Sequence, residues 1–329
     1  MLTRRLSPGD GVLTCSLDGH ARAHLADVQF SYPLKLIVPA RRFLPRVQCA
    51  YVIGYGGGLV AGDRVRLKVE VEEGTTLVLL TQGSTKVFKT RPGRYLTTTP
   101  ALGASNTTEQ QYRLSVGPSA LLVLLPAPVT CFSRARYAQR QVVRLAAESS
   151  SLVLLDWYTS GRMALGKAGP DGEEWEFESY RSENEVWLCG GGGDEGTTTR
   201  LAKDVLLLED ENPPQTSPDD PAAPRHKTTY VPRVAPYSCY ATLFLFGPQT
   251  ASLRRALETS FTALEQHKLP APYALVWSYS ALPGHPEGGG VARCAAATTE
   301  GVKEWVVQVL QLGGIEELVG KDLWKTAFN

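Results

Sequence analysis

The sequence has no long apolar run, no excess of charge of one sign and no obvious targeting segment. No stretch of about 18 apolar residues occurs in its 329 residues, so we expect no membrane-spanning helix. Two arginines near the start are followed by no apolar run, which predicts a cytoplasmic protein without a signal peptide. Lys and Arg number 34 against 33 Asp and Glu, a formal net charge of +1. This balance argues against a general nucleic-acid binder, which needs a basic surface.

Metal-binding and disulfide patterns are also missing. The six cysteines lie far apart with no CxxC pair, so we interpret them as reduced core thiols. Of the five histidines, His20 and His24 are four residues apart, a spacing that would suit a metal only on a helix. The residues around them favour a strand or loop. A closed zinc site is therefore not expected, whereas a transient, carboxylate-rich path for a metal ion needs no spaced signature.

Catalytic motifs are equally scarce. The chain has no Gly-x-Ser-x-Gly elbow and no phosphate-binding loop with Gly-Lys-Ser/Thr. Gly56, Gly58 and Ala61 formally match a dinucleotide fingerprint, but a strand rather than a helix is expected after them. A tight glycine turn, in which Asp63 accepts backbone N–H bonds, is the plainer interpretation. The functional alternative makes Asp63 a buried carboxylate that lines a polar path.

The first three quarters of the chain read as strands. Residues 64–71 alternate charged and apolar side chains, as a strand with one solvated face does. Short continuous apolar runs predict strands buried on both faces at 77–80, 121–125 and 152–155. Further strands are expected at 23–30 and 137–145, with a strand pair formed by Trp175, Phe177 and Val186–Leu188. Frequent turn signals favour a sandwich, barrel or coil of strands over βαβ units.

Helices and a polar insertion are expected in the last third. Apolar residues recur every three or four positions in 249–267 and in 300–312, so the region 249–312 is expected to contain two helices. The segment 209–228 is Pro-rich and almost free of apolar residues, which predicts a disordered surface insertion.

Two polar stretches could face a partner or a cavity. The segment 81–89 follows an apolar run and is rich in hydroxyl groups, with Lys86 available for a carboxylate on another protein. Its plainer interpretation is a strand with a solvated face. Arg134 and Arg136 are two residues apart, on one face of an expected strand, where they could grip acidic groups.

Several of these segments together resemble the UreD (UreH) family of urease accessory proteins. The resemblance runs in order from Tyr32-Pro33-Leu34 to the end of the chain, so we treat 1–329 as a single UreD-like domain. Phe88 stands where tyrosine is frequent in the family, and the long insertion is more typical of a fungal or other eukaryotic member. The blocks that carry the resemblance are Gly56–Asp63, Arg64–Val71, Thr81–Phe88, Leu125–Phe132 with Ala135–Tyr137, Asp156–Arg162 and Leu323–Thr326.

The resemblance implies a mostly β fold, a long β-helix-like stack of sheets with a small helical portion near the C-terminus. It implies a non-catalytic scaffold that helps to assemble the dinuclear nickel centre of urease. The expected partners are the urease apoprotein, UreF and, through UreF, the GTPase UreG, with neither nucleic acid nor membrane. No tightly bound cofactor is expected, although nickel could pass through transiently.

The family's internal polar tunnel suggests roles for five residues of this chain. Asp63 and Asp156 are the carboxylates expected on a transient nickel path, because a conduit needs oxygen ligands and no tight site. Lys86, Arg136 and Arg162 are expected to face a partner or the tunnel. Each of the five could instead be a structural hydrogen-bonding residue.

Two other functions remain open at this level. A β-architecture hydrolase acting on carbohydrate would need a pair of carboxylates in a cleft, and nothing local selects such a pair. A plain β-sheet interaction module without a metal role is the second alternative.

Overall fold

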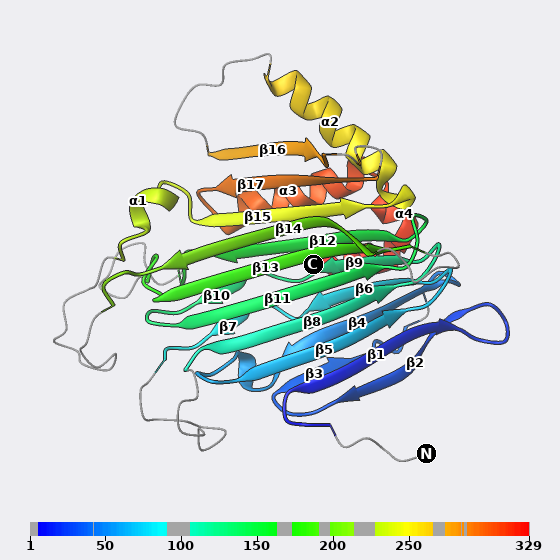
Figure 1. Ribbon diagram of the computed structural model, residues 1–329, viewed down its shortest axis with the longest axis horizontal. Coiled ribbons are helices and arrows are strands. Elements are labelled where there is room, and N and C mark those ends of the chain that lie inside the picture. Colours follow the sequence, from blue (N-terminus) through cyan, green and yellow to red (C-terminus); the bar gives the residue numbers. More distant parts are fainter. Residues whose placement is uncertain are drawn as a thin grey trace.

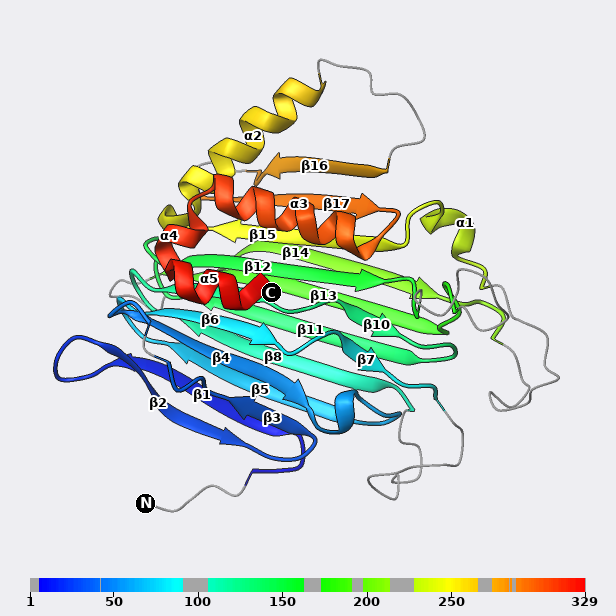
Figure 2. The same ribbon diagram turned by 180° about the vertical axis from the view of Figure 1, so that it is seen from behind.

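Two β-sheets pack face to face, and helices cover one of them. The computed structural model describes residues 6–41, 43–90, 106–162, 173–190, 198–213, 228–265, 274–283, 285 and 288–328. We call the seven-stranded sheet the outer sheet, because no described helix lies over it (Figure 1). The ten-stranded sheet is the central sheet, since it lies between the outer sheet and the helices α3, α4 and α5 (Figure 2).

The outer sheet has the strand order β14-β13-β11-β8-β5-β1-β2. Its strands are β1 (Asp10–Leu17), β2 (Ala23–Phe30), β5 (Arg64–Val71), β8 (Thr108–Val116), β11 (Arg136–Leu145), β13 (Ser179–Cys189) and β14 (Thr198–Glu209).

The central sheet has the order β16-β17-β15-β12-β9-β6-β4-β3, with β7 and β10 attached beside β12. Its strands are β3 (Leu34–Ile37), β4 (Val47–Gly54), β6 (Thr76–Thr81), β7 (Thr85–Val87), β9 (Leu121–Leu125), β10 (Val129–Cys131), β12 (Ser151–Thr159), β15 (Cys239–Phe246), β16 (Leu275–Ala281) and β17 (Gly289–Ala296).

The chain builds both sheets together by crossing from one to the other. It runs through β5, β6, β8, β9, β11 and β12, which belong alternately to the outer and the central sheet. Successive strands in each sheet are therefore parallel neighbours, as in the pairs β5–β8, β8–β11, β6–β9 and β9–β12. This coiled path confirms the mostly β, β-helix-like stack. The sheets stay open, with β14 and β2 at the edges of one and β16 and β3 at the edges of the other.

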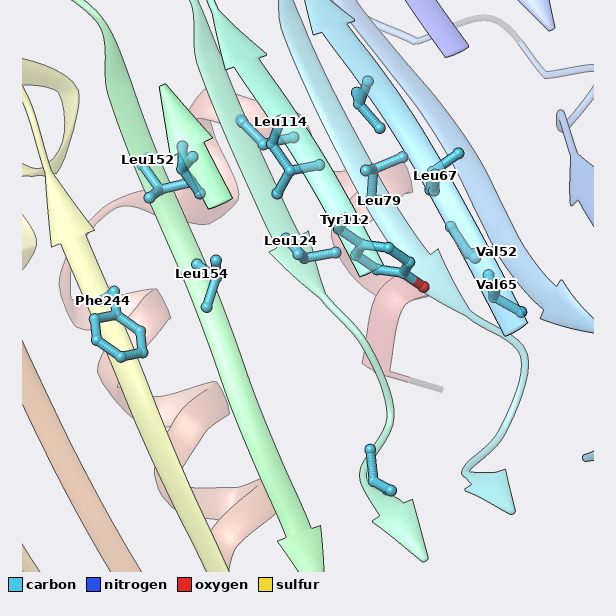
Figure 3. Packing of buried hydrophobic residues seen from close by; sticks show 14 of the residues in the cluster. Val52, Val65, Leu67, Leu79, Tyr112, Leu114, Leu124, Leu152, Leu154 and Phe244 are labelled. Atoms are coloured by element: carbon cyan, nitrogen blue, oxygen red, sulfur yellow. The ribbon is translucent and has the colours of Figure 1, made fainter. Parts of the chain in front are cut away.

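Side-chain alternation creates two separate apolar layers. In β9, Leu122 and Leu124 point toward the outer sheet, whereas Leu121, Val123 and Leu125 point toward the helices. All five residues are buried, because both faces of this strand are covered. Figure 3 shows the layer between the sheets, where residues of both sheets interlock. The continuous apolar runs of the sequence thus mark the strands of the central sheet, as expected.

Two of the five described helices, α2 and α3, lie where the apolar stripes predict helices, whereas α1, α4 and α5 were not predicted. The helices are α1 (Val231–Val234), α2 (Ala251–Glu265), α3 (Thr299–Leu312), α4 (Ile315–Val319) and α5 (Lys321–Phe328). Thr298 caps α3 by accepting a hydrogen bond from the N–H of Gly301 at 3.1 Å. The buried stripe of α3 packs against the central sheet. No helix in the described ranges is long and apolar enough to cross a membrane.

The predicted strand pair between the Trp175–Phe177 segment and Val186–Leu188 does not form. Trp175 and Phe177 lie in an irregular segment before β13, and Trp175 has a positive φ of 56°. Their rings pack around Tyr230 instead of forming a strand. The strand that pairs antiparallel with β13 is β14, whose mixed pattern gave no signal in the sequence because it is an edge strand.

The expected insertion at 209–228 begins and ends in ordered structure. Glu209 is the last residue of β14, and Asp210 and Thr228 are buried. The carboxylate of Asp210 accepts hydrogen bonds from the backbone and side chain of Thr229. Residues 214–227 lie outside the described residues, so the disorder expected there stays a prediction.

The layer between the sheets should dominate stability. Leu154 on β12 is 1% exposed within that layer, so Leu154→Ala removes buried methyl groups and leaves a cavity. We expect the free energy of unfolding, measured by urea denaturation, to fall by about 2–5 kcal/mol. Leu312→Ala is the control, because Leu312 is 71% exposed and its loss should change stability by no more than about 0.5 kcal/mol. Equal effects of the two changes would contradict the assignment of the core.

Candidate functional site

A band of polar side chains crosses the apolar layer on the inner face of the outer sheet. Gln139 and Gln141 alternate with the outward-facing residues of β11, and both are buried. Ser182 and Asn184 stand beside them on β13, in register with Gln139 and Gln141 respectively. Hydrogen bonds join the strands, from Gln139 Nε2 to Ser182 Oγ at 2.8 Å and from Gln141 Nε2 to Asn184 Oδ1 at 2.9 Å.

Asp156 of the central sheet reaches across to this band. It lies on the inward face of β12, between Leu154 and Tyr158 of the apolar layer. Its carboxylate accepts hydrogen bonds from Gln139 Nε2 at 2.6 Å, from Asn184 Nδ2 at 2.7 Å and from the hydroxyl of Ser182. The three neutral donors favour the charged form, but burial outweighs them and raises the pKa of Asp156 above its ordinary value.

One end of the band opens to solvent. Asn184 is in register with Asp204 on the edge strand β14, and Asp204 pairs with Arg293 of β17 at 2.7 Å. The side chain of Arg293 is 53% exposed and that of Asp204 is 26% exposed. Within the central sheet, Thr242 of β15 is in register with Asp156 of β12 on one side and with Arg293 of β17 on the other. The polar band therefore leads from the centre of the molecule to the edge of both sheets.

The other end of the band meets a small cavity. Gln110 on β8 is the cross-strand neighbour of Gln139 and lines a cavity of about 70 Å³ beside the glycine turn. A larger cavity of about 690 Å³ lies on the helix side of the central sheet, lined in part by Trp157 and by Lys303 of α3. The two cavities share Ile53 and the segment 81–83 in their walls. The Thr81–Gln82–Gly83 segment, singled out in the sequence as polar, thus separates a helix-side cavity from the space between the sheets.

Asp63 makes the backbone contact that the plainer interpretation predicts, and its place on a nickel path stays a prediction. It is 4% exposed, and its Oδ2 accepts the backbone N–H of Val60 at 2.9 Å, which closes the turn before β5. Gly58 lies so close to Lys86 that an added Cβ would come within 2.7 Å of the Lys86 carbonyl oxygen. The strand that follows excludes a dinucleotide-binding helix at this turn. Asp63 bonds within its turn, whereas Asp156 bonds to the outer sheet.

The arginines expected to face a partner are engaged in ion pairs. Arg136 donates to Glu178 at 2.7 Å, and Arg134 also pairs with Glu178. Arg134 lies in a turn with φ of 62° and not on the strand, so the expected shared strand face does not form.

Arg162 belongs to a second, partly buried cluster. It forms a two-point ion pair with Glu173, and its guanidinium lies 4.5 Å from the ring centre of Phe132. This pairing lowers the pKa of Glu173, although burial opposes it. Lys86 is exposed on β7, and within the described ranges it has no ion-pair partner.

The described residues of the band do not form a ready-made metal site. In the described part of the chain, no three His, Cys, Asp or Glu side chains come together as a metal site. Among the described residues, Asp156 is the carboxylate at the centre of the band, and its neighbours Gln139, Asn184 and Ser182 direct N–H and O–H donors toward it. The amide oxygens are engaged elsewhere, since Gln139 Oε1 accepts from the hydroxyl of Tyr137 at 3.1 Å and Asn184 Oδ1 accepts from Gln141 Nε2 at 2.9 Å. An ion could bind in this band only by breaking the hydrogen bonds that these polar side chains form with one another.

The sequence indicated Asp156 but missed the residues around it. The missed residues are Gln139, Gln141, Ser182 and Asn184. The only feature of the sequence that indicates them is their position along the strand. Each takes an inward place on a strand whose other inward residues are apolar, such as Val143 on β11. Alternation along β11 could have revealed the two glutamines, but the meeting with Asp156 depends on the packing of the sheets.

Comparison with known proteins places the whole chain in one group. The family model described as "UreD urease accessory protein" matches residues 9–325. The chain is 35% identical over 326 residues to "Urease accessory protein 4" of Cryptococcus neoformans, which covers 94% of each chain. It is 32% identical to "Urease accessory protein D" of Arabidopsis thaliana, covering 88% of this chain and 91% of that protein. A bacterial "Urease accessory protein UreD" from Anaeromyxobacter is 35% identical over 69% of this chain and 62% of its own.

Asp156 should make stability depend on pH in an unusual direction. Its folded pKa is raised, so protonation of this group favours folding. This contribution is present below the unfolded pKa, near 3.8, and is lost as pH rises through the folded pKa. We therefore expect wild type to lose stability relative to Asp156→Asn as pH rises from about 3 to 7. Urea unfolding of both proteins across this range measures the difference, and a flat or opposite trend would contradict burial of the carboxylate.

Proposed function

Since this chain belongs to the UreD family of urease accessory proteins, we propose that it is a non-catalytic scaffold and nickel conduit for urease. In this proposal it binds the urease apoprotein, UreF and, through UreF, the GTPase UreG. Nickel is the cargo and passes through the chain on its way to the dinuclear centre of urease. Cytoplasmic location remains a prediction from the sequence.

The observation that carries the proposal is the polar band between the sheets. A layer filled only by apolar side chains would exclude a hydrated cation, because removing its water without replacement ligands is very unfavourable. Here the carboxylate of Asp156 lies in that layer together with the amide and hydroxyl groups of Gln139, Ser182 and Asn184, which hydrogen-bond to it and to one another. Nickel also binds imidazole and thiolate strongly, and no three His, Cys, Asp or Glu side chains gather as a metal site among the described residues. Oxygen ligands that must give up hydrogen bonds favour transit over storage.

The cavities support a direction for the route. The helix-side cavity of about 690 Å³ is open to a partner and is separated from the inner cavity by Thr81–Gly83. We place the entry there and assign the docking of UreF to the helix layer. The ion would then pass Gln110 and Asp156 and leave beside Asp204 and Arg293. At the exit, Asp204 would stay paired with Arg293 until the cation competes with Arg293 for the Asp204 carboxylate.

The test removes the charge of Asp156 without changing its shape. Asp156→Asn keeps one oxygen for the donors but loses the only carboxylate at the centre of the band. Urease apoprotein is loaded with this variant, UreF, UreG, GTP and Ni²⁺, and nickel per urease is measured by mass spectrometry. We expect the initial loading rate to fall by about tenfold or more, by analogy with lost groups that support a metal ligand. Binding of the variant to UreF should be unchanged.

A matched carboxylate on the outside provides the control. Asp27 accepts a hydrogen bond from Gln29 on the edge strand β2, so Asp27→Asn makes the same chemical change away from the band. Its loading rate should equal that of wild type. Normal loading with Asp156→Asn would remove the carboxylate from the route. Normal nickel in urease after deletion of the whole chain would instead favour a plain interaction module.

A further inference from the structure

The outer face of the outer sheet carries a group of cationic side chains and no covering layer. The four strands β8, β11, β13 and β14 are open on this side (Figure 1). Alternation directs one set of residues on each strand outward, and the cations are found in that set. We call these residues the basic face: Arg113, Arg140, Arg144, Arg181, Arg200 and Lys203.

Two acidic residues of β13 lie beneath the cations. Glu183 and Glu185 on β13 are only 9% and 5% exposed. Lys203 and Arg140 each pair with both glutamates, and Arg181 pairs with Glu183 at 2.8 Å. The paired cations are 38–54% exposed, so the charge presented to solvent is positive although the sheet contains both signs. A protein with a formal net charge of +1 thus has a locally basic surface.

Two arginines of the basic face are not neutralised in this way. Arg113 and Arg144 are exposed, and neither has an ion-pair partner among the residues that the structure describes. Arg113 is in register with Lys68 on β5, whose ammonium group pairs with Glu70. Two unpaired guanidinium groups on rigid strands are suited to bind carboxylates of a partner in a two-point geometry.

Apolar contact area lies within the same face. Trp187 is the cross-strand neighbour of Arg144 and of Arg200, whose guanidinium lies 5.6 Å from the tryptophan ring centre. On β14, Val205 and Leu207 are 44% and 48% exposed. Tryptophan and arginine are the residue types most often found at the centre of protein interfaces.

We propose that the basic face docks an acidic surface of the urease apoprotein, an inference that rests on the proposed function. The exposed apolar side chains of Val205 and Leu207 favour a protein over a nucleic acid. Five of the six cations are arginines, as expected for a protein interface, where lysine is depleted.

The position of the face agrees with the exit of the polar band. Lys203 and Asp204 are consecutive on β14, so they point to opposite sides of the sheet. Asp204 belongs to the open end of the band, whereas Lys203 belongs to the basic face. A recipient docked on this face would therefore stand at the edge where the cargo leaves, on the opposite side from the helix-side cavity.

The test reverses the two unpaired charges. Binding of the purified chain to urease apoprotein is measured by biolayer interferometry for wild type and for Arg113→Glu/Arg144→Glu. We expect the Kd to rise by about tenfold or more, because like charges then face each other. Between about 50 and 300 mM NaCl, wild-type binding should weaken strongly, and the variant should show a smaller salt dependence. Both residues are exposed, so the thermal unfolding temperature should not change.

A control variant carries the same change in charge on another side of the molecule. Arg255 on α2 and Lys321 on α5 are exposed, and Arg255→Glu/Lys321→Glu should change the Kd by less than about twofold. Equal weakening by both double variants, or none by either, would overturn the assignment of the basic face and leave the proposed function intact. Absence of urease binding by wild type would overturn both. Equally tight binding of a short RNA duplex at about 150 mM NaCl would overturn the choice of a protein partner.

Discussion

Burial of the central sheet on both faces is the constraint on which the rest of this structure depends. Its strands β6, β9 and β12 have few polar side chains, because one face meets the outer sheet and the other meets the helices. The chain can supply the two layers only by crossing repeatedly between the sheets. This path brings strands from distant parts of the sequence into parallel register and fixes where a polar residue can enter the interior.

In this apolar layer, Asp156 is an energetically unfavourable residue. A carboxylate in an apolar layer is unfavourable unless hydrogen bonds replace its water, and here three donors from the facing sheet do so. A fold selected for stability alone would gain from an apolar side chain at this position. The polar band that runs from the inner cavity to the sheet edge is the feature on which the proposed transit of the ion rests.

Much of the fold could be predicted from the sequence, because alternation and short apolar runs report burial directly. The run Leu121–Leu125 predicts a strand covered on both faces, and residues 64–71 predict one with a solvated face. The strand β14 gave no such signal, since an edge strand mixes exposed apolar and charged residues. Among the site residues, Asp63 and Asp156 were both expected to be functional, yet one closes a turn and the other bonds across the sheets. Sequence position cannot separate these cases, because the distinction lies in which strand faces which.

The crossing path also bears on how the chain acquires its structure. Along the chain, a strand of the other sheet lies between the two members of each parallel pair, as β9 does between β8 and β11. The pair therefore forms only after the chain has crossed to the other sheet and returned. Contacts of this kind close long loops before they add favourable burial, which makes folding slow. During that time the apolar strands of the central sheet have no cover, because α3, α4 and α5 are the last elements in the chain. We therefore expect newly synthesised protein to aggregate readily, and the C-terminal helices to complete folding by shielding a sheet that would otherwise self-associate.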